Sequence, residues 1–179
     1  RGFLINQSSN TDGYMRYKNT ESGISPRALP GLEGYGHVVA TDEHDEDSVL
    51  ISEEFTNPHK RQMMVEKRGR KFSDIASAVA PPQLEGPEDA QVTLVGWGST
   101  YGVIKEAVEL LKDEGVVANH LPIKWIVPFH AGVVTEILSQ ANRTIVVENN
   151  YSGQFYRYMR GETGLLVDGH IRKYDGEPF

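Results

Sequence analysis

A glycine-rich turn is the stretch of this sequence whose residue types and spacing come closest to a recognisable chemistry. Gly96, Gly98 and Gly102 follow a short apolar run and precede a segment with helical periodicity. Glycines in that setting let a phosphate group approach the free N–H groups at the start of a helix. The turn is therefore a candidate nucleotide site, with Gly98, Ser99 and Thr100 as its candidate ligand residues.

Two departures from the dinucleotide-binding pattern weaken that interpretation of the turn. Gly102 comes one residue later than the third glycine of the standard fingerprint. The next predicted strand runs into Val127 and Pro128, so no acidic residue stands at its end to hold a ribose. We favour a tight strand-to-helix turn in which Ser99 or Thr100 caps the helix, with the nucleotide site as the alternative.

A second group of polar side chains stands at the end of another predicted strand. Glu148, Asn149 and Asn150 come there, shortly before residues 152–154 (Ser-Gly-Gln), where a helix is expected to begin. Their carboxylate and amide groups could bind a ligand or a neighbouring subunit. They could equally satisfy backbone groups of the loop, and the sequence leaves both interpretations open.

Two charged clusters lie in the first half of the chain. Residues 43–46 (Glu-His-Asp-Glu) are of metal-ligating types. Adjacent residues rarely converge on one ion, so we favour a loop that is solvated or salt-bridged to Lys60, Arg61 or Lys67. Residues 67–71 (Lys-Arg-Gly-Arg-Lys) could contact a phosphate-bearing cofactor held elsewhere in a complex, but a solvated or subunit-facing surface is the commoner use of such a run.

The composition excludes several kinds of site and partner. The 179 residues include no cysteine, which excludes disulfides, thiolate-bound zinc and cysteine-held iron–sulfur clusters, and favours a cytoplasmic setting. The formal net charge of -7 argues against nucleic acid, and no apolar run is long enough to span a membrane. We assign no catalytic residue and no metal ligand. Five histidines stand singly and are expected to be structural: His37, His59, His120, His130 and His170.

The pattern of turns and helix signals divides the sequence near residues 81–82, a proline pair. Glycines and prolines interrupt residues 1–36 and leave no room for long regular elements. An Asn-Pro pair then opens a helix expected over residues 57–79. We therefore expect a loop-rich connector with one helix over 1–85 and a separate α/β domain over 86–179.

The second domain alternates strand and helix patterns. Its first and third strands are nearly continuous in apolar residues, as in parallel sheets covered on both faces. This predicts a three-layer α/β/α sandwich with a mostly parallel, Rossmann-like sheet whose functional edge lies at the carboxyl ends of the strands. Strands are predicted at 92–95, within 120–127, at 144–147 and at 165–167, and helices at 103–111, at 133–141 and after a cap at Ser152.

Seven motifs in order along the chain resemble the alpha subunit of 2-oxoacid:ferredoxin oxidoreductases, and the 2-oxoglutarate type is the nearest match. The similarity runs from about Tyr14 to the end, and the first residue, Arg1, fits a fragment that is the C-terminal portion of such a subunit. The motifs are residues 25–31 (Ser-Pro-Arg-Ala-Leu-Pro-Gly), 43–46, 67–71, 96–100, 128–129, 147–154 and 174–179.

The resemblance implies an activity and partners. Enzymes of this family decarboxylate a 2-oxoacid on thiamine diphosphate, form an acyl-CoA and pass electrons through iron–sulfur clusters to ferredoxin. Residues 86–179 are similar to the C-terminal domain of transketolase-like enzymes, which mainly builds subunit contacts. The beta subunit supplies the diphosphate and magnesium site and the cluster cysteines. This chain is thus expected to bind no cofactor itself and to serve assembly, and a free-standing nucleotide- or CoA-binding Rossmann-like module is the alternative.

Overall fold

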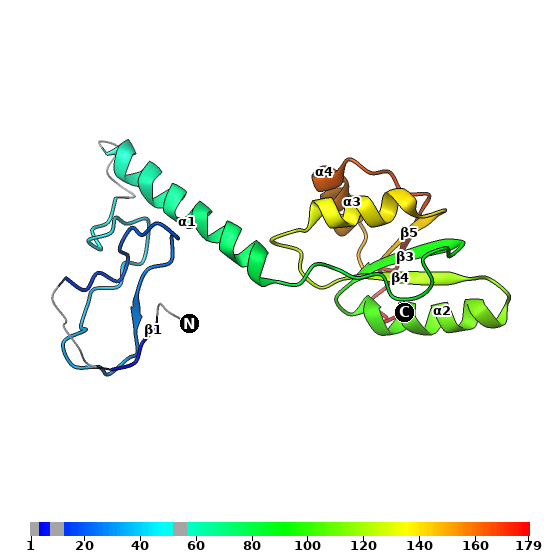
Figure 1. Ribbon diagram of the computed structural model, residues 1–179, viewed down its shortest axis with the longest axis horizontal. Coiled ribbons are helices and arrows are strands. Elements are labelled where there is room, and N and C mark those ends of the chain that lie inside the picture. The colour runs from blue at the N-terminus through cyan, green and yellow to red at the C-terminus, as the bar shows by residue number, and fades with distance from the viewer. Residues whose placement is uncertain (1–3, 8–12, 52–56) are drawn as a thin grey trace. The chain divides into compact units, whose positions relative to one another are not determined.

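The chain forms two compact units, Arg1–Ala78 and Val79–Phe179, in a computed structural model that describes residues 4–7, 13–51 and 57–179 (Figure 1). The boundary expected from the sequence lay between residues 85 and 86. The structure places 79–85 in the second unit, and Glu85 exchanges two backbone hydrogen bonds with His120 there, at 2.8 and 2.9 Å. These bonds attach the residues after the proline pair to the edge of the sheet of the second unit.

The first unit consists of loops packed on one helix, α1 (Pro58–Ala78), which confirms the predicted helix. The Asn57 side-chain oxygen accepts the backbone N–H of Lys60 at 3.1 Å, so Asn57 is the N-cap. The loops contribute one short parallel pair, β1 (Leu4–Ile5) and β2 (Arg27–Ala28). None of the helices in the described part of the chain is both long and apolar enough to cross a membrane.

The second unit is a parallel four-stranded sheet with helices on both faces, as predicted. The strand order is β4-β3-β5-β6, and every neighbouring pair is parallel. Figure 1 shows α3 and α4 on one side of the sheet and α2 on the other. The elements are β3 (Val92–Trp97), α2 (Thr100–Asp113), β4 (Ala118–Ile123), α3 (Ala131–Gln140), β5 (Thr144–Glu148), α4 (Gln154–Thr163) and β6 (Gly169–Arg172).

Two hydrophobic clusters lie on the two faces of this sheet. Val95 of β3 packs into the cluster that includes Val134 of α3 and Met159 of α4. Leu94, its neighbour along the strand, packs into the other cluster with Ile104 of α2. Adjacent residues of a strand point to opposite faces, so a strand covered by helices on both sides needs a continuous apolar run.

Two boundaries of the sheet differ from those expected. The second strand ends at Ile123 and not near residue 127. The strand predicted at 165–167 is wrong, because these residues form a loop in which Leu165 and Val167 pack against the core without joining the sheet. Strand pairing begins only at Gly169, opposite Ile145.

Candidate functional site

The two groups of candidate residues lie at one edge of the parallel sheet. β3 lies in the middle of the sheet, with β4 as its neighbour on one side and β5 on the other. The strand order therefore reverses direction at β3. Ligands of open α/β sheets bind outside the carboxyl ends of the strands at such a switch point. Residues 98–100 follow β3, residues 148–150 stand at the end of β5, and the rings of Trp97 and Phe155 lie 6.2 Å apart between them.

The glycine-rich turn is closed by a threonine hydroxyl. Thr100 is buried, and its Oγ1 accepts the backbone N–H of Trp97 at 3.0 Å and donates to the Trp97 carbonyl at 2.9 Å. Ser99 stands at the N-cap position of α2 but makes no side-chain capping bond, so the predicted helix cap is wrong. A Cβ on Gly96 would collide with Ile104 and Thr100, which explains the glycine without a ligand.

A cleft of about 490 Å³ lies beside this turn, at the ends of β3 and β4. Gly98 contributes to its wall, together with two aromatic residues, Trp97 and Tyr101, and one cation, Lys124. Glu148, Asn149 and Asn150 are not among the described residues that line it. The two candidate groups therefore share a sheet edge but not this cleft.

Glu148 is a fully buried carboxylate with four partners. Its Oε2 accepts the Phe155 backbone N–H at 2.9 Å and the Asn150 side-chain amide at 2.6 Å. Its Oε1 accepts the Tyr156 backbone N–H at 3.1 Å and lies 2.7 Å from Nε2 of His170. The carboxylate thus satisfies N–H groups in the first turn of α4 and complements the positive end of that helix.

Asn150 completes the same cap. Its Oδ1 accepts the backbone N–H groups of Gly153 and Gln154 at 2.8 and 3.1 Å. The N-cap position is held by Gly153, at φ 66°, and not by Ser152 as expected. Asn149 is exposed. This geometry favours the interpretation in which Glu148 and Asn150 satisfy the backbone, and it leaves Asn149 free for a ligand or a subunit.

The surroundings of Glu148 favour its ionised form. Burial raises the pKa of this carboxyl, but the hydrogen bonds from Asn150, from the backbone of Phe155 and Tyr156 and from His170 lower it. The outcome is a pKa below the usual value of 4.5. The four hydrogen bonds stabilise the ionised carboxylate by more than its burial destabilises it.

This pKa predicts acid sensitivity of the second unit. The folded-state pKa of Glu148 lies below the unfolded one, so its contribution to stability is full above about pH 4.5 and is lost as the pH falls through the folded-state pKa. Urea unfolding between pH 6 and pH 3 should show a steeper loss of stability for the wild type than for Glu148→Gln. Parallel curves for the two proteins would contradict the assignment.

The acidic loop of the first unit is held by salt bridges. Asp45 is buried, and its carboxylate lies 2.5 Å from Nζ of Lys60. Lys60 is one of the salt-bridge partners that the sequence suggested for this loop. Glu43 pairs with Arg68 at 2.8 Å, a residue that was not among the partners suggested for this loop. The described residues contain no group of three or more His, Cys, Asp or Glu side chains placed to hold a metal ion.

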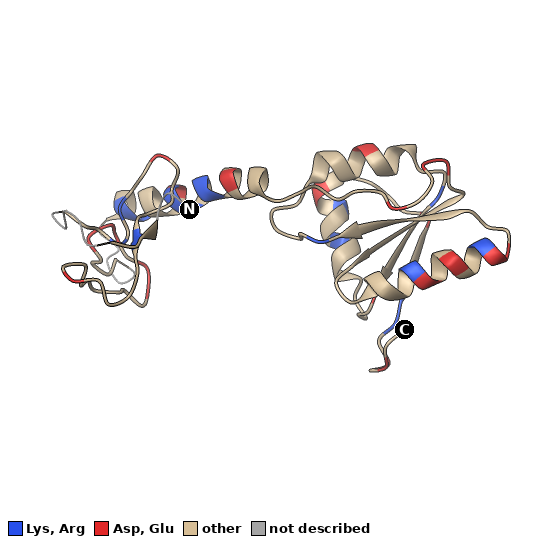
Figure 2. Cartoon of the chain, turned by 60° about the horizontal axis from the view of Figure 1, so that its bottom comes forward, with Lys and Arg blue, Asp and Glu red and all other residues tan. Residues whose placement is uncertain are grey.

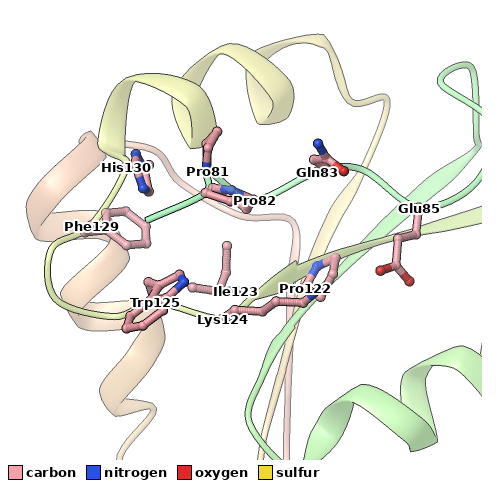
Figure 3. Close-up of a pocket in the computed structure, with 11 residues that line it drawn as sticks. Pro81, Pro82, Gln83, Glu85, Pro122, Ile123, Lys124, Trp125, Phe129 and His130 are labelled. Carbon is pink, nitrogen blue, oxygen red and sulfur yellow. The ribbon is translucent and has the colours of Figure 1, made fainter. Parts of the chain in front are cut away.

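Two imidazoles that the sequence analysis named only as structural, those of His120 and His130, have buried ring nitrogens. His120 is 2% exposed, faces Tyr101 at 5.4 Å between ring centroids, and burial lowers its pKa below 6.5. His130 is half-buried and lines a cavity of about 150 Å³ together with Phe129 and Trp125, and its Nε2 is shielded from solvent (Figure 3). Neither Nε2 atom has a hydrogen-bond partner among the residues that the structure describes. Because His120 falls within a predicted strand of a sheet covered on both faces, its burial could have been predicted from the sequence.

The fold and the sheet edge together define a Rossmann-like α/β domain whose main polar groups are engaged within the protein. Residues 90–172 match the family described as pyruvate:ferredoxin oxidoreductase core domain II. The chain is 37% identical over 169 residues to subunit alpha of 2-oxoacid:ferredoxin oxidoreductase 2 of Aeropyrum pernix, covering 93% of this chain and 25% of that protein. It is 32% identical over 154 residues to 2-oxoglutarate oxidoreductase subunit KorA of Mycobacterium tuberculosis, covering 85% and 22%.

A solved structure agrees with these relatives. The 2-oxoglutarate:ferredoxin oxidoreductase of Magnetococcus marinus, with 2-oxoglutarate, coenzyme A and succinyl-CoA bound, matches 97% of this chain and 30% of its own, with a TM-score of 0.80 and 29% identity. The chain belongs to the family of 2-oxoacid:ferredoxin oxidoreductase alpha subunits. It spans about a quarter of the length of the first of these curated relatives.

Proposed function

We propose that this chain is the assembly domain of the alpha subunit in a thiamine diphosphate-dependent 2-oxoacid:ferredoxin oxidoreductase. The whole enzyme would convert a 2-oxoacid to an acyl-CoA and reduce ferredoxin. The chain would hold subunits together and contribute no reacting group. Its similarity to alpha subunits over most of its length supports the parent enzyme, and one feature of the sheet supports the assembly role.

That feature is an apolar face of the sheet that α2 covers only in part. A cleft of about 590 Å³ runs between α2 and the sheet, lined mainly by aliphatic side chains of α2, β3, β5 and β6. Ile171 and Phe179 in its wall are 48% and 42% exposed. Exposed apolar surface of this kind marks an interaction site, and we assign it to the beta subunit.

The described residues of this chain do not fit the iron–sulfur cluster or the magnesium ion of the parent enzyme. An iron–sulfur cluster needs cysteines, and the chain has none. The magnesium ion that holds thiamine diphosphate needs converging oxygen ligands, and the part of the chain that the structure describes offers no such group. We therefore place both sites, and the chemistry, on other parts of the complex.

A charge placed in the apolar cleft tests the assembly role. In the complete alpha subunit, Ile171→Asp should lower the recovery of the beta subunit in copurification about tenfold or more, because burying an unpaired carboxylate at a contact is costly. Leu166→Asp is the matched control, since Leu166 is 70% exposed and lies outside the cleft. Normal assembly of the Ile171 variant would refute the assignment.

The second candidate function is a nucleotide-binding module, favoured by the cleft beside the glycine-rich turn. Its aromatic walls, Trp97 and Tyr101, suit a planar ring, and Lys124 suits a phosphate. Calorimetry with NAD, NADP, ATP and CoA addresses this site. Tight binding that Lys124→Gln weakens would favour the module over the assembly domain.

A further inference from the structure

A cleft in the first unit gathers positive charge, although the whole chain has a formal net charge of -7. Its volume is about 520 Å³, and α1 forms one wall while the loop around β2 forms another. Figure 2 shows the run of Lys and Arg along α1. Five cationic residues line the cleft: Arg16, Arg27, Lys67, Arg68 and Lys71.

Most of this charge has no counter-charge. Arg68 is neutralised by both carboxylate oxygens of Glu43, at 2.8 and 3.0 Å. Arg16 stacks its guanidinium over the ring of Tyr17, 5.4 Å from the centroid. Among the described residues, Arg16, Arg27 and Lys71 have no carboxylate partner. Three fixed cations at one cleft therefore repel one another in the empty protein.

Lys67 adds a buried amine to the same wall. It is 3% exposed, and its Nζ donates to the backbone carbonyl of Tyr17 at 2.5 Å. Burial, followed by the charges of Lys71 and Arg16, lowers its pKa to about 8, although the charge of Glu46 raises it and that of Arg68 lowers it further. An ammonium group has three N–H donors, so the described contact leaves donors unused. The empty cleft is thus electrostatically unfavourable, and an anion would relieve it.

We propose that this cleft binds a small molecule that carries a diphosphate or longer phosphate chain. A diphosphate group brings about three negative charges at neutral pH, which matches the three uncompensated cations, whereas a single carboxylate brings one. Guanidinium groups such as those of Arg16 and Arg27 bind phosphate oxygens in pairs. Ile24 and Met64 add apolar wall for the rest of such a ligand.

Calorimetry with inorganic pyrophosphate on the full chain tests the site. Arg27→Gln and Lys71→Gln should each weaken binding about tenfold or more, and neither removes a described hydrogen bond or ion pair of the fold. Lys105→Gln is the control, because Lys105 is an exposed lysine on α2 in the other unit and should change nothing. Sulfate at equal ionic strength controls for a general effect of salt. Titrations with ADP and with CoA then show which of these two diphosphate-containing molecules binds more tightly.

The buried lysine supplies a second readout. At pH 8 the amine of Lys67 is about half deprotonated, so pyrophosphate binding should take up as much as about half a proton. Titrations in buffers of different ionisation enthalpy measure this uptake. The absence of pyrophosphate binding at millimolar concentration would overturn the proposal, and so would an equal loss in Lys105→Gln or binding without proton uptake at pH 8.

Discussion

Replacing Glu148 with alanine should lower the free energy of unfolding of the second unit by about 3–5 kcal/mol. The carboxylate is fully buried and accepts from two backbone N–H groups of α4 and from the side chain of Asn150. Its removal leaves these donors without an acceptor and leaves His170 without its partner at 2.7 Å. Each buried donor that loses its acceptor costs about 1–3 kcal/mol.

Urea unfolding followed by circular dichroism measures this loss. Glu162→Ala is the matched control, because Glu162 is an exposed carboxylate on the same helix and should change stability by about 0.5 kcal/mol or less. Glu148→Gln should lie between the two, since it keeps the shape but turns one acceptor into a donor. A loss below about 1 kcal/mol in Glu148→Ala would mean that the cap of α4 is not needed for the fold.

The strands that could be predicted are those whose apolar sequence pattern reflects burial inside the sheet. Strands at 92–97 and 144–148 sit between helices, so their apolar runs identified them. The edge strand β6 carries Gly-His-Ile-Arg and has no such run. The strand was predicted instead at the nearby apolar residues 165–167, where Leu165 and Val167 are partly buried by packing against the core and not by joining the sheet, and Leu166 is exposed. Burial without strand pairing leaves no distinct pattern in a sequence.

The sequence placed Glu148 and Asn150 at the end of a strand but could not decide between a ligand-binding role and a role in satisfying backbone groups. Glu148 and Asn150 stand where predicted, yet their hydrogen bonds to α4 depend on a left-handed residue at Gly153 that no spacing rule specified. The cationic cleft of the first unit could not be predicted from the sequence either. Residues 67–71 were recognisable as a basic run, whereas Arg16 comes to the same cleft from a loop and Arg27 from β2, both roughly forty to fifty-five residues earlier in the chain. Convergence of distant residues is a property of the tertiary structure.

Gly153→Ala should cost about 2–4 kcal/mol of stability in the second unit. The backbone of Gly153 has φ 66°, and an alanine there loses about 1–2 kcal/mol to strain. Its Cβ would also overlap Cε1 of His170. That ring is not free to move aside, because its Nε2 lies 2.7 Å from the buried carboxylate of Glu148. The overlap therefore adds about 1–3 kcal/mol by forcing the ring from its place.

Gly164→Ala separates the strain from the overlap. Gly164 ends the same helix at φ 74°, and a Cβ there meets no atom within 4 Å, so this variant should show the strain alone, about 1–2 kcal/mol. Chemical denaturation of the two variants side by side gives the difference, which should be at least about 1 kcal/mol. Since the overlap acts through His170, the further change His170→Ala should make Gly153→Ala and Gly164→Ala equally costly. A persistent gap would show that His170 does not hold the turn before α4 in place.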